Sequence, residues 1–374
     1  MRLARASRRP AAGALTFLVA LACAASVGRA PAQATQVPDH RRTPPASGPG
    51  EVPPALGAGV VHHLRGTYRV LTTDVADPGT RSRPDGPPDL AHTHDQVTDV
   101  LEVGGRWVRL HLPPGHHLVA GQTVELSGSG AGSTFDALSY RVLSAPLSVD
   151  TTDVTKTLVI LAYWNSKDSV TKAKAADVVF TQGNAWWKEA SYGLTSLSGT
   201  VVDWVKITDP GDCRANGDVL MSRARTKAQE LIGSLTSFER TIVYFPYCSY
   251  AAGAAGWAYV PGTRVWLNGY MDKRVSIHEQ GHNYGLLHAH AYHCSSGGKY
   301  VTLGGSCSYD EYGDDFDAMG GSELVGHYNA AEKQRLGWMS GRVSTLSASG
   351  TYTLPPLERT GSEILGARLW RLPP

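Results

Sequence analysis

One stretch of the sequence combines residue types and spacing that suit metal-assisted hydrolysis. It reads His278-Glu279-Gln280-Gly281-His282-Asn283-Tyr284-Gly285-Leu286-Leu287-His288. Residues four apart share one face of a helix, so His278 and His282 can direct ring nitrogens at one metal ion. Gly285 can adopt the positive φ that ends a helix and reverses the chain, which lets His288 return as a third ligand.

Three neutral imidazoles leave one position on the metal for water, and zinc held in this way lowers the pKa of that water to about 7. Glu279 stands beside the histidines, where its carboxylate can reach the water as a general base without being a ligand. The pattern therefore predicts one catalytic Zn²⁺ with His278, His282 and His288 as ligands and Glu279 as the catalytic residue.

Two further histidines, His290 and His293, compete with His288 for the third position. The spacing from Gly285 favours His288. The alternative for the whole stretch is a helix whose histidines face solvent or satisfy buried polar groups, and the complete spacing favours a metal site over this interpretation.

After Asp150 the chain alternates apolar strands with amphipathic helices, a pattern that predicts an α/β domain able to position these residues. Asp168 or Ser169 is expected to cap the first helix, which ends at Gly193. The predicted strands are 157–163, 197–207, 241–247, 257–260 and 263–267, and the predicted helices are 168–192, 218–232, one from near 271 and 329–336.

Sequence composition divides the rest of the chain. Residues 1–34 have a basic end, an apolar run and small residues at Ala32-Gln33-Ala34, which predicts a signal peptide and therefore secretion. Residues 35–58 form a Pro-rich linker, and 59–150 alternate like a small all-β barrel or sandwich. A catalytic domain is expected over 151–340 and a C-terminal β segment over 341–374, where the natural product could extend further.

Charge excludes one class of partner. The chain carries 35 basic and 33 acidic residues, but five arginines and no acidic residue fall in the first 34 positions. Without them the charge is −3, too low in basic residues to hold nucleic acid by counterion release. A membrane anchor is the alternative to the signal peptide, but the apolar run of residues 11–27 is Ala-rich and short for one. No later segment is apolar enough to span a bilayer, and the sequence does not indicate an oligomeric state.

Four cysteines remain beyond the predicted signal peptide, an even number that favours two disulfides in an exported protein. Three pairings are possible. The moderate loops that they close favour Cys213 with Cys248 and Cys294 with Cys307, and free buried thiols are the alternative.

Beyond the histidines, Asp317-Ala318-Met319-Gly320-Gly321 places a methionine in a turn of small residues. The long histidine motif and this turn resemble the metzincin clan of zinc peptidases over about 152–340. The family most similar is gametolysin, on the segments Ser191-Tyr192-Gly193, Tyr312-Gly313-Asp314 and Leu336-Gly337-Trp338. The resemblance implies an α/β (α+β) metzincin-like zinc peptidase domain with a twisted mixed sheet, here preceded by the small all-β domain.

The resemblance also implies an extended polypeptide substrate that adds a strand to an edge of the sheet, at Trp257–Val260 by position. Some metzincins have a tyrosine ligand two residues after the turn methionine, but Gly321 stands there. Many relatives block the metal with a propeptide cysteine, and none lies between Cys23 and Cys213. If residues 35–150 are an inhibitory pro-region, a histidine or an Asp must cap the metal instead of a cysteine. The candidate histidines are more simply interpreted as solvated loop residues: His62, His63, His92, His94, His116 and His117.

The acidic residues Asp310, Glu311, Asp314, Asp315 and Asp317 could bind Ca²⁺, but solvated carboxylates, turn caps and a partner for a metal-ligating histidine are favoured. The sequence thus predicts a secreted zinc-dependent endopeptidase of extracellular proteins. One alternative is a peptidase of another zinc clan with Glu311 or Glu323 as third ligand. The other is an exported adhesion or surface-binding protein with a non-catalytic zinc site.

Overall fold

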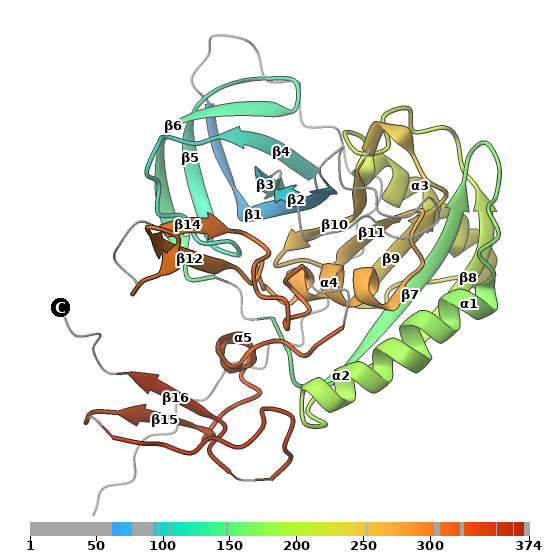
Figure 1. The fold of residues 1–374 in the computed structure, drawn as a ribbon. Helices are drawn as coiled ribbons and strands as arrows, with labels where there is room; N and C mark the ends of the chain where they lie inside the picture. The colour runs from blue at the N-terminus through green and yellow to red at the C-terminus, as the bar shows by residue number, and fades with distance from the viewer. Residues whose placement is uncertain are drawn as a thin grey trace, which may run out of the picture. The chain divides into compact units, whose positions relative to one another are not determined.

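The computed structural model of this chain describes residues 62–76, 93–95, 97–104, 106–146, 149–251, 253–302, 307–321, 325–348, 350–361 and 363–369 (Figure 1). The predicted signal peptide (1–34) and linker (35–58) lie outside these ranges. Residues Ala46–Pro374 belong to one compact unit. Within the described ranges, every helix is too short or too polar to cross a bilayer.

Five strands form the sheet segment that underlies the predicted site. Their order is β8 (Ser196–Lys206), β7 (Val154–Tyr163), β9 (Arg240–Phe245), β11 (Arg264–Asn268) and β10 (Ala254–Val260). The first four run parallel to one another, and β10 is antiparallel to β11. This mixed sheet agrees with the α/β pattern predicted from the sequence.

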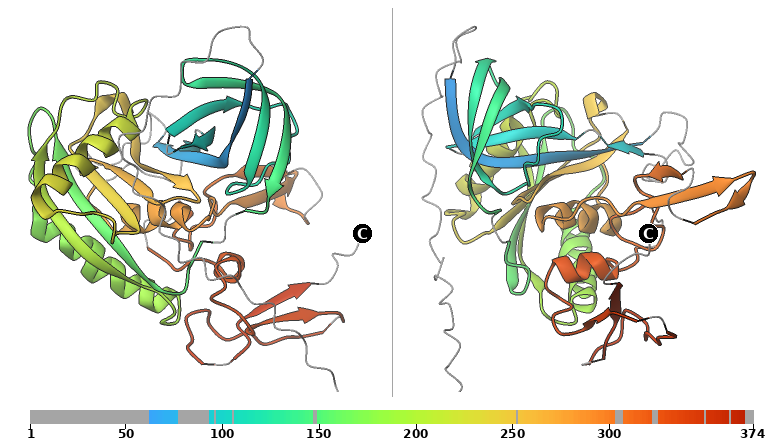
Figure 2. Two further views of the ribbon diagram at one scale, coloured as in Figure 1. Left: turned by 180° about the vertical axis from the view of Figure 1, so that it is seen from behind. Right: turned by 90° about the vertical axis from the view of Figure 1, so that its left-hand side faces the viewer.

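Helices cover both faces of this segment because β7 presents apolar side chains to each face in turn. Val159 and Leu161 pack in one core with Trp187, and Leu158 and Ile160 pack in the other with Leu220. The first face carries α1 (Lys172–Ala176), the π-helical turn η2 (Asp177–Gly183), α2 (Asn184–Ala190) and α4 (Lys273–Asn283), and the second carries α3 (Gly217–Ile232) (Figure 2).

The start of the first helix differs from the prediction. The helix begins at Lys172, and the Thr171 hydroxyl accepts the capping hydrogen bond from the Lys174 N–H at 3.1 Å. Asp168, predicted as a cap, instead accepts hydrogen bonds from the Val170 N–H and the Tyr244 hydroxyl. The buried tyrosine competes for this carboxylate, and nothing local in the sequence indicates that contact.

The N-terminal strands close into a ring, which we call the barrel. It consists of β1 (His62–Ala76), β3 (Thr98–Val103), β4 (Arg106–His111), β6 (Thr134–Ser144) and β5 (Thr123–Ala131), with β5 returning to β1. Leu101, Val124 and Phe135 are fully buried in its core. The short β2 (Thr93–Asp95) pairs with the end of β1. Because the barrel shares one hydrogen-bonded sheet with β10, a domain boundary near 150 stays a prediction.

The predicted free edge at Trp257–Val260 is wrong for this structure. β10 pairs with β11 on one side and with β1 on the other, antiparallel, from Val70 opposite Val260 to Val75 opposite Ala254. Figure 1 shows β1 running beside β10. The expectation failed because β1 comes from a part of the chain far away in sequence.

The chain after α4 forms smaller elements. They are β12 (Ala291–Ser296), β13 (Lys299–Tyr300), β14 (Cys307–Asp310), α5 (Ala330–Arg335), β15 (Val343–Leu346) and β16 (Gly366–Leu369). The 3₁₀ turn η3 (Ser249–Ala251) precedes β10. The predicted disulfides are confirmed, since Cys213 bonds to Cys248 and Cys294 to Cys307.

Candidate metal centre

Helix α4 carries most of the predicted site through the interior of the molecule. Asp272 caps its start, because its Oδ1 accepts hydrogen bonds from two backbone N–H groups of the first turn at 2.7 and 3.4 Å. Every residue from Arg274 to Asn283 is buried, although the segment is polar. Burying polar side chains costs free energy unless they find polar partners, so a helix of this kind suggests a functional role.

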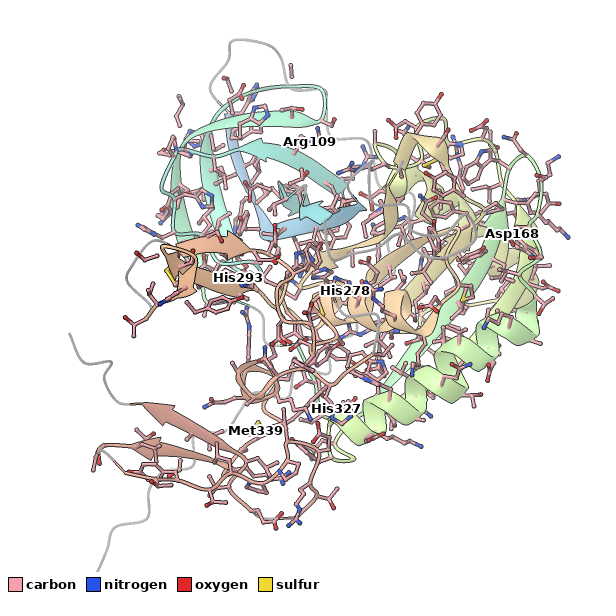
Figure 3. The ribbon with its side chains drawn as sticks, in the orientation of Figure 1. Arg109, Asp168, His278, His293, His327 and Met339 are labelled. Carbon is pink, nitrogen blue, oxygen red and sulfur yellow. A yellow bond between two sulfur atoms is a disulfide. The ribbon has the colours of Figure 1, made fainter. Side chains whose placement is uncertain are left out.

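Three imidazoles converge near the end of α4, and Figure 3 labels the first of them, His278. His278, His282 and His288 are buried, and each offers a ring nitrogen within 4.8 Å of those of the other two. Their ring centroids lie 4.9 to 5.2 Å apart. Within the described ranges, this is the one group of three or more His, Cys, Asp or Glu side chains that could hold a metal ion.

Hydrogen bonds fix which nitrogen of each ring faces a metal. Nδ1 lies 2.9 Å from the Ala318 carbonyl in His278, 2.9 Å from the Leu286 carbonyl in His282, and 3.2 Å from Glu311 Oε1 in His288. Carbonyl and carboxylate oxygens can only accept, so each Nδ1 carries the proton and each Nε2 presents a lone pair. Metal-ligating histidines hold their second nitrogen in this way, so the donor set fits a metal.

A chain reversal after α4 brings His288 to the other two histidines. Gly285 has φ +94°, a region that side chains disfavour. Its N–H donates to the His282 carbonyl at 2.8 Å, and the Leu286 N–H donates to the Gly281 carbonyl at 3.1 Å. The reversal therefore ends the helix and also places the Leu286 carbonyl that orients His282.

Glu279 is fully buried between α4 and β10. A Cβ on Gly256 of β10 would lie 2.7 Å from Glu279 Oε1, so the backbone of β10 must pass without a side chain at this point. Glu279 therefore belongs to the helix that carries the first two histidines, and its carboxylate lies against strand β10.

The turn around Met319 packs against α4 and accepts hydrogen bonds from both sides of the histidine motif. The Ala318 carbonyl accepts from His278, and the Met319 carbonyl accepts from the Ala289 N–H at 3.0 Å, just after His288. A Cβ on Gly281 would overlap Met319 Sδ, so this glycine allows α4 to sit directly on the turn. The turn thus holds both ends of the histidine motif.

Two buried carboxyl groups hold this turn. Asp317 accepts hydrogen bonds from the backbone N–H groups of Met319 at 2.6 Å and Asn329 at 2.5 Å. Burial and the neighbouring Asp317 raise the pKa of Glu332 to about 10, and burial also raises the pKa of Asp317. Glu332 therefore stays protonated near neutrality and donates its proton in a hydrogen bond to Asp317.

This assignment predicts how stability depends on pH. The pKa of Glu332 is about 10 in the folded protein against 4.5 ordinarily, so the folded state keeps a proton that the unfolded state releases between these values. The free energy of unfolding then falls as pH rises through this window. Glu332→Gln removes the titration and keeps a donor. We expect urea unfolding to show the variant gaining a few kcal/mol on the wild type between pH 5 and 9.

Glu230→Gln is the control, because it makes the same chemical change at an exposed glutamate that pairs with Lys227 on the surface. Parallel stability curves for the wild type and Glu332→Gln would contradict a protonated Glu332.

The competing ligands lie elsewhere. The Nδ1 of His290 is 3.1 Å from the His288 carbonyl, and exposed His293 lies on β12 with its Nε2 3.6 Å from Asp310 (Figure 3). Glu311 bonds the outer nitrogen of His288, which is the role of a partner to a histidine. Glu323 lies outside the described residues.

The acidic cluster caps turns. Asp310 accepts from the Tyr312 N–H at 3.2 Å, Asp314 accepts from the Phe316 N–H at 3.1 Å, and Asp315 is exposed. The cluster forms no metal-binding group among the described side chains, and a calcium ion stays a prediction without a described site.

The barrel histidines also stand apart from the triad. His63 Nδ1 lies 2.8 Å from the Ser127 hydroxyl on the exposed surface, and the Leu118 N–H approaches His116 Nδ1 at 3.4 Å. No histidine among the described side chains of 62–146 joins the triad, including His62 and His117. His92 and the side chain of His94 lie outside the described parts.

Sequence reasoning did not assign four residues that shape the site. The Tyr312 ring lies 4.0 Å from the His288 ring, and the Tyr328 hydroxyl donates to the Ile277 carbonyl of α4 at 3.2 Å. Asp272 and Glu332 are the other two. Asp272 could have been found as a capping residue ahead of the histidine motif, whereas the others meet the site only through tertiary packing.

A buried triad of imidazoles, two on a helix packed against a mixed sheet and one just after that helix, is a donor set that fits a metal ion. Comparison with protein families shows more: the family model described as Gametolysin peptidase M11 matches residues 163–374. The chain belongs to this family and is a metallopeptidase, which confirms the resemblance seen in the sequence. No curated protein matches the chain.

Proposed function

We propose that the chain is a secreted zinc-dependent endopeptidase of the metzincin type that hydrolyses peptide bonds in extracellular proteins. The observation that carries this proposal is the triad itself: three buried imidazoles, each with Nδ1 held by an acceptor, offer ring nitrogens that lie within 4.8 Å of one another. An all-nitrogen set of three ligands is typical of catalytic zinc, which keeps one position open.

Zinc held by His278, His282 and His288 would lower the pKa of water to about 7 and polarise the scissile carbonyl. Glu279 takes the proton of the attacking water on its carboxylate and then passes it to the leaving amine nitrogen. Its buried position between α4 and β10 keeps bulk water away, which strengthens electrostatic interactions in the site and limits loss of the proton to solvent.

Other features support the remaining parts of the proposal. Two disulfides agree with an oxidising compartment, and with a predicted signal peptide they favour secretion. A peptidase requires a polypeptide substrate, so the proposal includes an extended chain that binds beside the triad.

The proposal is tested on the purified full chain by measuring its metal content together with its cleavage of a peptide library. We expect about one zinc per chain and cleavage that a chelator removes and added Zn²⁺ restores, because unliganded imidazoles cannot activate water as a metal does. Mass spectrometry of the products gives the bond preference. Full hydrolysis by metal-free protein would refute the proposal.

A further inference from the structure

Strand β1 of the barrel occupies the edge of the sheet that borders the triad. The five-stranded segment has two outer strands, β8 and β10, and only β10 packs against α4. All seven residues of β10 are buried, with β1 hydrogen-bonded along the edge. An edge strand left open would present backbone groups to any extended chain.

The register places β1 alongside the part of β10 that lies against Glu279. Val70, Leu71, Thr72 and Thr73 pair regularly with Val260 to Trp257, and the pairing then slips before Val75 meets Ala254. Gly256, whose backbone lies against Glu279, falls within the slipped part. β1 thus follows β10 past the residue that lies against Glu279, the proposed general base.

Specific contacts hold β1 and the barrel in this position. Arg69 Nη1 donates to the Pro261 carbonyl just after β10 at 2.7 Å, while its other nitrogens bond Glu102. On barrel strand β4, Trp107 stacks on Tyr259 of β10, with ring centroids 3.9 Å apart and planes at 12°. The pairing therefore involves side chains as well as backbone.

Two strands cannot hydrogen-bond the same edge of a sheet at once. We propose that β1 is a built-in competitor that covers the substrate edge of the metallopeptidase, so that a polypeptide binds only after β1 leaves β10. This inference rests on the proposed function. It requires no cysteine, and none occurs between Cys23 and Cys213.

The competitor model predicts opposite effects from loosening and locking β1. Arg69→Ala removes the bond to Pro261 and should raise the rate of peptide-library cleavage about tenfold, because the open fraction grows. A disulfide between Thr72→Cys and Ala258→Cys, directly opposite in the register, should lower the rate below that of either single variant. The cleavage rate of the locked variant is measured without added reductant, so that the disulfide stays formed.

Arg141→Ala is the matched control for Arg69→Ala. Arg141 forms an ion pair with Glu125 on the exposed surface of the same barrel, so its loss should leave cleavage unchanged. Thermal melting of each variant checks that the barrel remains folded, and the locked variant tests the inference even if Arg69→Ala unfolds.

A binding measurement separates this inference from the proposed function. Fluorescein-labelled random decapeptides are titrated onto the same variants in a Glu279→Gln background, with anisotropy as the readout. Tighter binding to Arg69→Ala and weaker binding to the locked protein support competition, even if no variant cleaves. Equal cleavage by wild type, loosened and locked proteins, or equal binding where none cleaves, overturns the competitor role of β1.

Discussion

Glu279→Gln should abolish peptide cleavage while leaving the zinc content unchanged. The amide has nearly the shape of the carboxylate but cannot accept a proton from the attacking water, and general acid–base groups contribute about 10²–10⁴-fold in rate. The histidines keep their Nδ1 bonds to Ala318, Leu286 and Glu311, so the metal should remain. The measurement is kcat on a quenched peptide together with metal analysis.

Glu230→Gln makes the same chemical change on the exposed face of α3 and should leave both quantities as they are. If Glu279→Gln cleaves peptides at the wild-type rate, then another group serves as the base. If it loses zinc as well as activity, its role is structural, and the site keeps no assigned catalytic residue.

The peptidase elements could be predicted because their signals are local. The apolar run that predicts a strand at 157–163 lies within β7, and the helix predicted at 218–232 is α3 to within one residue, ending before Gly233 with φ +78°. The histidine motif needs only one helical turn and one glycine reversal, so its geometry was also accessible from the sequence. Periodicity and capping suffice where contacts are close in sequence.

Contacts between distant parts of the chain were not accessible. The Thr72 hydroxyl reaches the Ala258 carbonyl across 186 positions, and no pattern in either strand indicates that partner. The proton held by Glu332 depends on burial beside Asp317, which a sequence does not show. The same holds for Asp168, whose capping signal was overridden by a buried tyrosine. Tertiary competition for polar groups decides these positions.

The metal site and the barrel meet at one strand. β10 lies against Glu279 through Gly256 and against the barrel through Tyr259 and its backbone. A side chain at 256 would displace the carboxylate, and a weakened edge would release β1. In the competitor model, β10 therefore couples activity to its restraint, and its pairing on both sides buries all seven of its residues.

His288→Ala should remove both zinc and activity, and it separates the proposed ligand set from its alternatives. Two imidazoles on α4 would remain, and a site that loses one of three protein ligands no longer holds the ion through dialysis. His290→Ala is the matched control, because His290 lies two residues away and its Nδ1 is hydrogen-bonded to the His288 carbonyl rather than facing the triad. It should keep zinc and cleavage.

Glu311→Gln tests the alternative in which the carboxylate of Glu311, and not His288, is the third metal ligand. As a partner of His288 Nδ1 it should weaken zinc binding by about 10–100-fold without eliminating it. If Glu311 were itself the third ligand, Glu311→Gln would remove the ion and His288→Ala would retain it. Zinc content is measured after dialysis against a graded series of chelator concentrations. Substitution of the true third ligand should remove the zinc even at the lowest concentration, whereas substitution of its partner should not.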